Sequence, residues 1–192
     1  MISNRCIVRP LWAAVIVAAL QTGVIGYMVQ SRAAILRNGA EVVLKAAPVD
    51  PRDLLRGDYV VLSYDISTVP VASLVGQQPG YKNDARLWVR LKPEADGYWA
   101  VAESSFSELP EMAGSVVMRS QPFKAIMLSP DGAFHVTYGI ERYFVPEGEG
   151  HLLEEARQAG AVSIVARVSN SGEAQIRDLR VDGKPVYQEP LY

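Results

Sequence analysis

Residues 11–29 read LWAAVIVAALQTGVIGYMV, a run of nineteen residues without a charged side chain. As an α-helix rising about 1.5 Å per residue, this run would span roughly 28 Å, which is about the thickness of the hydrocarbon core of a bilayer. Trp12 and Tyr27 lie near its two ends, where amphipathic rings favour the membrane interface. The sequence therefore predicts one transmembrane helix that anchors the chain in the lipid bilayer.

The basic residues ahead of this run, Arg5 and Arg9, also suit a cleaved signal peptide. The run is longer than the usual apolar region of such a peptide, which has about 7–15 residues. The best small-x-small cleavage site after it, residues 31–33, has an arginine at its centre. Cys6 precedes the run and so is not placed for lipid attachment. We interpret the segment as an uncleaved signal anchor.

The charges on the two sides of this run are nearly balanced, with Arg5 and Arg9 before it and Arg32 and Arg37 after it. A very short N-terminal tail ahead of a first transmembrane helix usually stays inside the cell, and the domain behind it is then exported. We therefore predict a cytoplasmic N-terminus and an extracytoplasmic remainder.

Two parts of the chain follow from this interpretation. Residues 30–37 favour continuation of the helix past the bilayer, and Asn38-Gly39 is a typical C-terminal stop. Residues 1–38 are thus expected to form the N-terminal tail, the transmembrane anchor and a stalk helix. Residues 39–192 contain no linker-like stretch and have the length of one domain.

The charged residues are unevenly distributed between these parts. All 21 acidic residues and fifteen of the 19 basic residues lie from Gly39 onward, so this part carries a net charge of about −6. A nucleic-acid-binding domain needs a concentrated basic face, and no cluster of lysine or arginine exists here to form one. We therefore expect no nucleic-acid partner.

The sequence after Gly39 consists of short segments separated by turn residues, with many β-branched and aromatic side chains, which is typical of β-structure. Residues 58–66 are predicted to form one central strand covered on both faces, and residues 151–158 a short helix. The expected fold class is mainly β: an N-terminal transmembrane helix plus one antiparallel β-sandwich or partly open barrel domain with a short helix. Three hairpins are expected, in which residues 85–92 pair with 98–104, 123–128 with 133–138, and 162–168 with 174–181.

Residues 57–64 read GDYVVLSY and match the pattern G-D-Y-x-x-L-x-Y at every fixed position. A second segment, residues 138–148, reads YGIERYFVPEG. With the N-terminal anchor, these segments make the chain similar to the GDYXXLXY family of bacterial membrane-anchored proteins. The resemblance implies an extracytoplasmic module, located in the periplasm of a bacterial cell and often associated with multi-span membrane proteins. It supplies no catalytic residues to carry over.

These two segments supply the candidate functional residues. On the structural interpretation Gly57 permits a turn that the Asp58 carboxylate caps, and the following side chains belong to the core. On the functional interpretation the polar side chains line a pocket. The candidate pocket or motif residues are Gly57, Asp58, Tyr59, Leu62 and Tyr64 from the first segment, and Tyr138, Glu141, Tyr143 and Glu147 from the second.

The loop after the second segment alternates Glu147, Glu149 and His151 with glycine, which favours either a helix N-terminus bearing carboxylates or a metal site. Two carboxylates and one histidine are few ligands for a metal, so we assign no metal and no cofactor. No serine or cysteine is spaced to form a triad with a histidine, and no phosphate-binding or dinucleotide-binding motif occurs.

The function that we expect is therefore a non-enzymatic accessory or partner-binding module, with a multi-span membrane protein as the partner. The alternatives are a hydrolase that uses Asp58, Glu141 or Glu147 as general acid or base, and a ligand-sensing domain with a tyrosine-lined pocket. We assign no catalytic residue.

Overall fold

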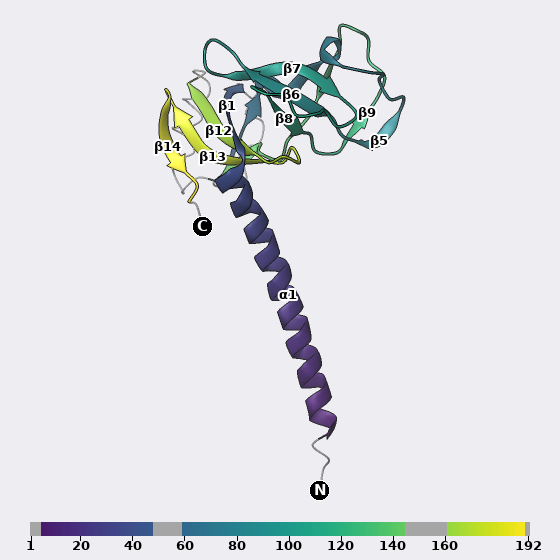
Figure 1. The fold of residues 1–192 in the computed structure, drawn as a ribbon, viewed down its shortest axis with the longest axis vertical. Coiled ribbons are helices and arrows are strands. Elements are labelled where there is room, and N and C mark those ends of the chain that lie inside the picture. The colour runs from purple at the N-terminus through teal and green to yellow at the C-terminus, as the bar shows by residue number, and fades with distance from the viewer. Residues whose placement is uncertain (1–4, 48–58, 145–160, 191–192) are drawn as a thin grey trace.

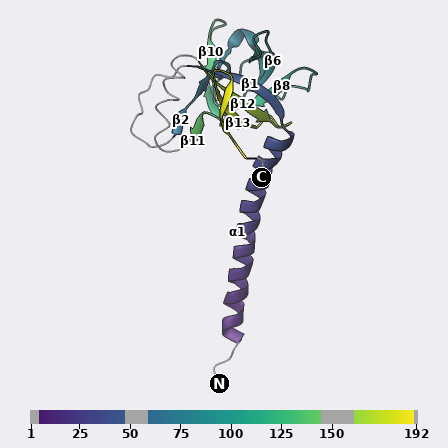
Figure 2. The same ribbon diagram turned by 90° about the vertical axis from the view of Figure 1, so that its left-hand side faces the viewer.

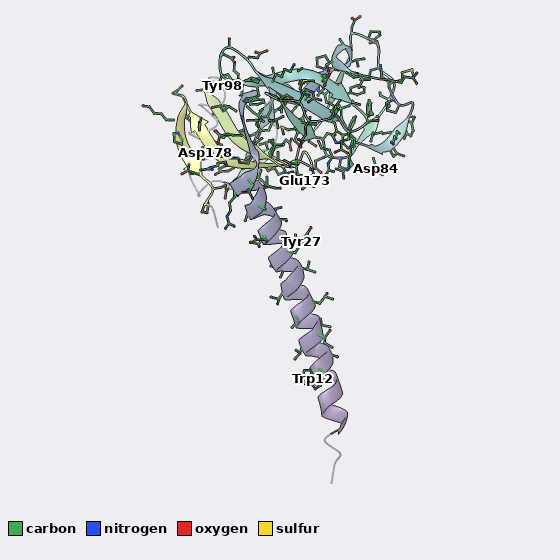
Figure 3. The ribbon with its side chains drawn as sticks, viewed as in Figure 1. Trp12, Tyr27, Asp84, Tyr98, Glu173 and Asp178 are labelled. Atoms are coloured by element: carbon green, nitrogen blue, oxygen red, sulfur yellow. The ribbon has the colours of Figure 1, made fainter. Side chains whose placement is uncertain are left out.

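The computed structural model describes residues 5–47, 59–144 and 161–190. Helix α1 (Arg5–Asn38) stands out from a β-rich domain, with the N-terminus at the end far from that domain (Figure 1). Large apolar side chains cover its surface from Trp12 onward, and the ring of Tyr27 is 76% exposed. Figure 3 shows Trp12 and Tyr27 well apart along the helix, both below the β-rich domain.

A helix with such a surface is stable when lipid replaces water around it. The segment Trp12–Asn38 is long and apolar enough to cross a membrane, and its apolar part is not buried inside the protein. The structure therefore supports a single-pass membrane protein anchored near its N-terminus.

The helix ends at Asn38, where the expected stop lies. The Gly39 amide donates to the Ile35 carbonyl at 2.8 Å, and Ala33 and Leu36 are buried where the last turns contact the domain. Gly39 is required by a close approach, because a Cβ there would lie 2.6 Å from the Ile35 oxygen. The helix is thus packed against the domain instead of being joined to it by a free linker.

Arg167 strengthens this junction from the neighbouring strand. Its guanidinium donates to the Gly39 carbonyl at 3.0 Å and pairs with the Glu41 carboxylate at 2.8 Å. Arg167 thus connects Gly39, the residue that follows the helix, to the strand that contains Glu41 and to its own strand in the same sheet. The direction in which the helix leaves the domain is therefore set by side-chain and backbone contacts together.

The larger sheet has five strands in the order β14-β13-β12-β1-β3. All of its pairs are antiparallel, and β1 continues directly from the helix. β14 forms the outer edge of this sheet (Figure 1). The strands are β1 (Ala40–Ala47), β3 (Ser63–Tyr64), β12 (Val162–Val168), β13 (Ala174–Val181) and β14 (Lys184–Gln188).

A second, three-stranded sheet has the order β7-β6-β8, and three small antiparallel pairs complete the domain: β10-β4, β11-β2 and β5-β9. The strands are β2 (Tyr59–Val61), β4 (Thr68–Pro70), β5 (Lys82–Ala85), β6 (Trp88–Pro93), β7 (Trp99–Ser105), β8 (Val116–Arg119), β9 (Phe123–Ala125), β10 (Ala133–His135) and β11 (Arg142–Phe144). Two short 3₁₀ helices, η1 (Asp65–Ser67) and η2 (Val71–Ser73), flank β4.

One apolar core lies between these sheets and draws on both. β1 and β12 contribute Val42, Leu44 and Ile164, all fully buried, and β6 contributes Val89 and Leu91. The expected mainly β fold class is confirmed, with several antiparallel sheets and no closed barrel among the described residues. The short helix predicted at residues 151–158 lies outside the described part of the chain.

Two local predictions are wrong. Residues 58–66 do not form one central strand, because β2 pairs with β11, β3 pairs with β1, and η1 follows. Nor is the segment covered on both sides, since Leu62 is buried while Val61 is 38% exposed. Residues 123–128 and 133–138 do not pair as a hairpin either, because β9 pairs with β5 and β10 with β4.

Candidate functional site

The two motif segments, far apart in the sequence, lie side by side in the fold. β2 pairs with β11 in the register Tyr59↔Phe144 and Val61↔Arg142. Beyond the last pair, the Leu62 amide donates to the Glu141 carbonyl at 2.8 Å. Figure 2 shows β2 and β11 together at one flank of the domain. The structure thus brings the described candidate residues into one region.

Two tyrosines join these segments through their hydroxyl groups. The Tyr64 hydroxyl donates to the Ile140 carbonyl at 2.5 Å, and the Tyr138 hydroxyl donates to the Ile66 carbonyl at 2.8 Å. All four residues are buried. We call this reciprocal pair of hydrogen bonds the tyrosine clasp. The Tyr64 hydroxyl is oriented by a backbone carbonyl of the second segment, and the Tyr138 hydroxyl by a backbone carbonyl two residues past the first segment.

The Glu141 carboxylate closes the turn that connects the clasp to β11. One of its oxygens accepts from the Tyr138 amide at 2.5 Å, and the other accepts from the Gly139 amide at 2.8 Å. Gly139 has φ +87°, a conformation that other residues rarely adopt. A carboxylate that accepts two backbone N–H bonds in a tight turn has a structural use.

The surroundings of the clasp keep both tyrosines protonated. Burial raises the pKa of the Tyr64 hydroxyl well above its ordinary value, and the Glu141 carboxylate raises it further. The pKa of the Tyr138 hydroxyl is raised for the same two reasons, in the same order. Both groups therefore act as hydrogen-bond donors at neutral pH, and neither is poised to take a proton from a substrate.

The other described candidates, Leu62 and Tyr143, are core residues. Leu62 is 1% exposed. Tyr143 is buried, and its ring centroid lies 6.1 Å from that of Tyr187. Burial, with the carboxylates of Glu189 and Asp178, raises the pKa of Tyr143 to about 12. The structural interpretation of these side chains is therefore favoured over a tyrosine-lined pocket.

Several candidate residues lie partly or wholly outside the residues that the structure describes. Tyr59 has a described backbone in β2, but Gly57, Asp58 and Glu147 lie outside the described residues, as do Glu149 and His151. Within residues 5–47, 59–144 and 161–190, no group of three or more His, Cys, Asp or Glu side chains could hold a metal ion.

A second feature, which the sequence did not indicate, is a groove of about 870 Å³ between β8 and the turn that connects β12 to β13. Its walls are residues 108–117 and 168–172, with Trp88 and Ala40. Ala40 is the first residue of β1, so the groove lies beside the point where the helix enters the domain. In Figure 1 the turn between β12 and β13 extends along the side of the domain that faces the helix.

One wall of the groove is held from beneath by a buried arginine. Arg90 on β6 is 1% exposed and pairs with the Glu103 carboxylate of β7. Its guanidinium also donates to the Pro110 carbonyl at 2.7 Å and to the Ser115 hydroxyl at 3.0 Å. A β-bulge between Arg90 and Leu91 interrupts the ladder at this position, and bulges commonly redirect a side chain. The Arg90 guanidinium therefore fixes both ends of the 110–115 loop.

The groove is closed at one end by a backbone contact. The Arg119 amide donates to the Gly172 carbonyl at 2.8 Å, and a Cβ at Gly172 would lie 2.9 Å from the Arg119 amide nitrogen. The Arg119 guanidinium also pairs with the Glu173 carboxylate at 2.8 Å. Figure 3 places Glu173 on the helix-facing side of the domain.

The comparisons with known proteins identify one family. The model of the family described as GDYXXLXY protein matches residues 21–179. That span contains the end of the helix, both motif segments and the groove. No curated protein and no solved structure matches the chain.

Proposed function

The chain belongs to the GDYXXLXY protein family, and from this premise we propose that it is a membrane-anchored accessory module that binds an integral membrane protein. The helix places the module at the bilayer, the β-rich domain provides the binding surface, and the domain lies on the extracytoplasmic face. The partner is a multi-span membrane protein whose exposed part reaches the groove beside the helix.

The observation that carries this proposal is the packed junction between the helix and the domain. A free linker would let the domain sample many orientations, whereas Gly39, Leu36 and Arg167 fix one. Binding a partner in the same membrane benefits from such preorganisation, because less orientational freedom is lost when the complex forms. The groove lies beside this junction, within reach of a neighbouring membrane protein.

The chemistry of the motif region supports a binding role over catalysis. The described groups with acid–base potential, Tyr64, Tyr138 and Glu141, are each used in hydrogen bonds to the backbone. A general acid or base must instead reach a substrate atom. The motif strand therefore contributes to the stability of the domain, and the groove is the surface left for recognition.

Photo-crosslinking in native membranes tests this function. A photoreactive amino acid at Met112, which is 49% exposed on the groove wall, should crosslink full-length protein to an integral membrane protein. The control is the same probe at Tyr81, which is 66% exposed on β5's side of the domain and outside the groove. No adduct at Met112, or equal adducts at both positions, would refute the proposal.

The orientation is tested separately with reporter fusions. A periplasm-active reporter fused after the C-terminus should be active, because the short basic N-terminal tail is retained inside. Activity restricted to a cytoplasmic reporter would reverse the assignment of the two faces.

A further inference from the structure

The geometry points to the groove as a strand-addition site that takes a short, extended, basic segment of the membrane partner, paired with the outer edge of β8. This inference rests on the proposed function and specifies how the partner is held. Its grounds are the free backbone groups of β8, the charge and apolar character of the groove walls, and the position of the groove.

The free backbone groups follow from the register of β8 against β6. The Ser120 amide donates to the Leu87 carbonyl at 2.8 Å, so this pair is a hydrogen-bonded one. In an antiparallel ladder bonded and non-bonded pairs alternate, which makes Arg90↔Val117 a non-bonded pair. The N–H and C=O of Val117 therefore point away from β6, toward the groove.

The same alternation makes Arg119 the next outward-facing residue of β8, and its amide is already bonded to Gly172. Val117 is different, because no described residue provides a partner for its amide or its carbonyl. Val117 is one of the residues that line the groove. The end of the groove is thus closed by a bond of the kind that an added strand would make, and the next position along the same edge is open to one.

The dimensions favour an extended occupant. β8 has four residues, and among its outward-facing residues only Val117 has no described partner. At about 3.3 Å per residue the edge therefore suits a short segment of about three residues whose central residue pairs with Val117. A helix presents no backbone groups to a strand edge, whereas an extended segment presents them at every second residue. The groove edge therefore selects the conformation of the occupant.

The residues that line the groove determine which side chains of the occupant fit. The charged residues among those that line the groove are Glu108 and Glu111, and both are exposed. Within the part of the chain that the structure describes, neither forms an ion pair. The groove is also lined by large apolar side chains, those of Trp88, Leu109 and Met112. An occupant that carries both lysine or arginine and apolar side chains complements the carboxylates and the apolar side chains that line the groove.

The 110–115 loop is held in place before any partner binds, because Arg90 bonds to it at both ends. A wall fixed in this way loses little freedom on binding. Anionic lipid head groups do not fit these walls, because the carboxylates of Glu108 and Glu111 would repel them. The position beside Ala40 instead suits a loop of a protein in the same membrane.

The test uses full-length protein in a neutral detergent and a dye-labelled, end-capped peptide of alternating lysine and valine, six residues long. Fluorescence anisotropy should show binding. An alternating glutamate–valine peptide should bind at least about tenfold more weakly, because its charge is reversed. A lysine–valine peptide with every peptide nitrogen methylated keeps the charge but cannot donate to the strand edge, and its binding should be lost.

Variants of the protein locate the binding. Replacing both carboxylates (Glu108→Gln with Glu111→Gln) should weaken binding of the lysine–valine peptide about threefold to tenfold at low salt, with a smaller effect at high salt. The matched control, Glu94→Gln, neutralises an exposed glutamate in the turn between β6 and β7, outside the groove, and should leave binding unchanged. Equal effects of the two changes would overturn the assignment.

Hydrogen exchange distinguishes the edge that is used. The Val117 amide should become protected when the lysine–valine peptide binds, while the outer edge of β14 should not. Protection of residues 184–188 alone would show that the peptide adds to the other free edge and would overturn the proposal. So would equal binding of the methylated peptide, which would show attraction by charge without strand addition.

The proposed accessory function and the strand-addition mode can be refuted separately. An adduct with a membrane protein at Met112, together with no peptide binding, would leave the accessory function standing and remove the strand-addition mode. An adduct at Met112 whose mass equals two copies of this chain would replace the membrane partner with self-association. Peptide binding with no membrane-protein adduct would refute the accessory function.

Discussion

The tyrosine clasp, formed by Tyr64 with Ile140 and Tyr138 with Ile66, can be weakened by removing one oxygen at a time. Tyr64→Phe and Tyr138→Phe keep the ring and delete the hydroxyl that donates to a buried carbonyl. Each change leaves that carbonyl without its donor, which costs about 1–3 kcal/mol of stability. Because both bonds join the same two segments, we expect the double variant to deviate from the sum of the single losses.

The same two side chains should control the stability of the domain in alkali. Burial, aided by Glu141, raises the pKa of Tyr64 and Tyr138 in the folded state. An unfolded tyrosine ionises near pH 10, as in model peptides, and releases a proton that the folded state still holds. Stability is therefore unaffected below about pH 10 and falls above it, by about 1.4 kcal/mol per pH unit for each tyrosine.

Urea unfolding of the full-length protein in neutral detergent, followed by tryptophan fluorescence between about pH 8 and about pH 11, measures both effects. Each phenylalanine variant should be less stable at pH 8. Above about pH 10 its free energy of unfolding should fall less steeply than that of the unchanged protein, by about 1.4 kcal/mol per pH unit. Tyr81→Phe, which removes the hydroxyl of an exposed ring, is the matched control. An unchanged alkaline slope in both Tyr64→Phe and Tyr138→Phe would refute the assignment of these groups as buried donors.

Three further substitutions test other contacts by the same unfolding assay. Leu62→Ala should cost about 2–5 kcal/mol because the side chain is fully buried; a loss below about 1 kcal/mol would place it outside the core. Gly39→Ala should cost about 1–3 kcal/mol, since its Cβ would lie 2.6 Å from a backbone oxygen of the last helical turn; no loss would mean that the junction relaxes freely. Glu141→Gln should cost about 1–3 kcal/mol because its amide group would face a backbone N–H, and an unchanged stability would contradict the turn-closing role.

The parts of the fold that sequence reasoning predicted are those specified by local pattern. An uncharged run from residue 11 to residue 29 is long and apolar enough to predict a spanning helix, and the structure continues the helix to Asn38 as expected. The hairpin of residues 162–168 and 174–181 is also confirmed, with the predicted bounds. In both cases the signal lies within one contiguous segment, so no distant partner had to be identified.

The prediction of one strand at residues 58–66 is wrong because the strands that pair with this segment are distant in the sequence. The β-forming side chains are present, but the segment changes partner at Leu62, whose amide bonds to Glu141. On one side of this residue the strand belongs with β11, and on the other it belongs with β1. Alternation in a sequence shows which face is apolar, and it does not show which strand lies alongside.

The false hairpin has a related cause. The turn predicted between its arms does form, because the Gly132 amide bonds to the Ser129 carbonyl at 2.9 Å. The arms then diverge to separate partners, residues 82–85 for β9 and residues 68–70 for β10. A tight turn fixes the reversal of the chain, while pairing beyond the turn is decided by which neighbours bury the two arms best.

In the candidate site too, the sequence indicates individual residues but not the distant groups that they contact. The sequence singles out the motif tyrosines, but their partners are backbone carbonyls, which leave no trace in a sequence. The groove gave one signal that could have been used: Arg90 stands among Trp88, Val89 and Leu91, where a charge must be either exposed or bonded. A buried arginine in a strand indicates that carboxylate and carbonyl groups converge on it. Here the carboxylate is that of Glu103 on β7, and the carbonyl is that of Pro110 in the loop that forms the groove wall.

The groove also joins the two sheets to the anchor. One wall belongs to β8 and its loop, in the second sheet, and the other follows β12, the strand that pairs with β1 directly after the helix. Arg167 of β12 holds the Gly39 carbonyl, and Val168, the next residue, lines the groove. A strand added to β8 would therefore sit against the same backbone that fixes the helix. A chain of direct contacts thus connects the groove to the end of the helix.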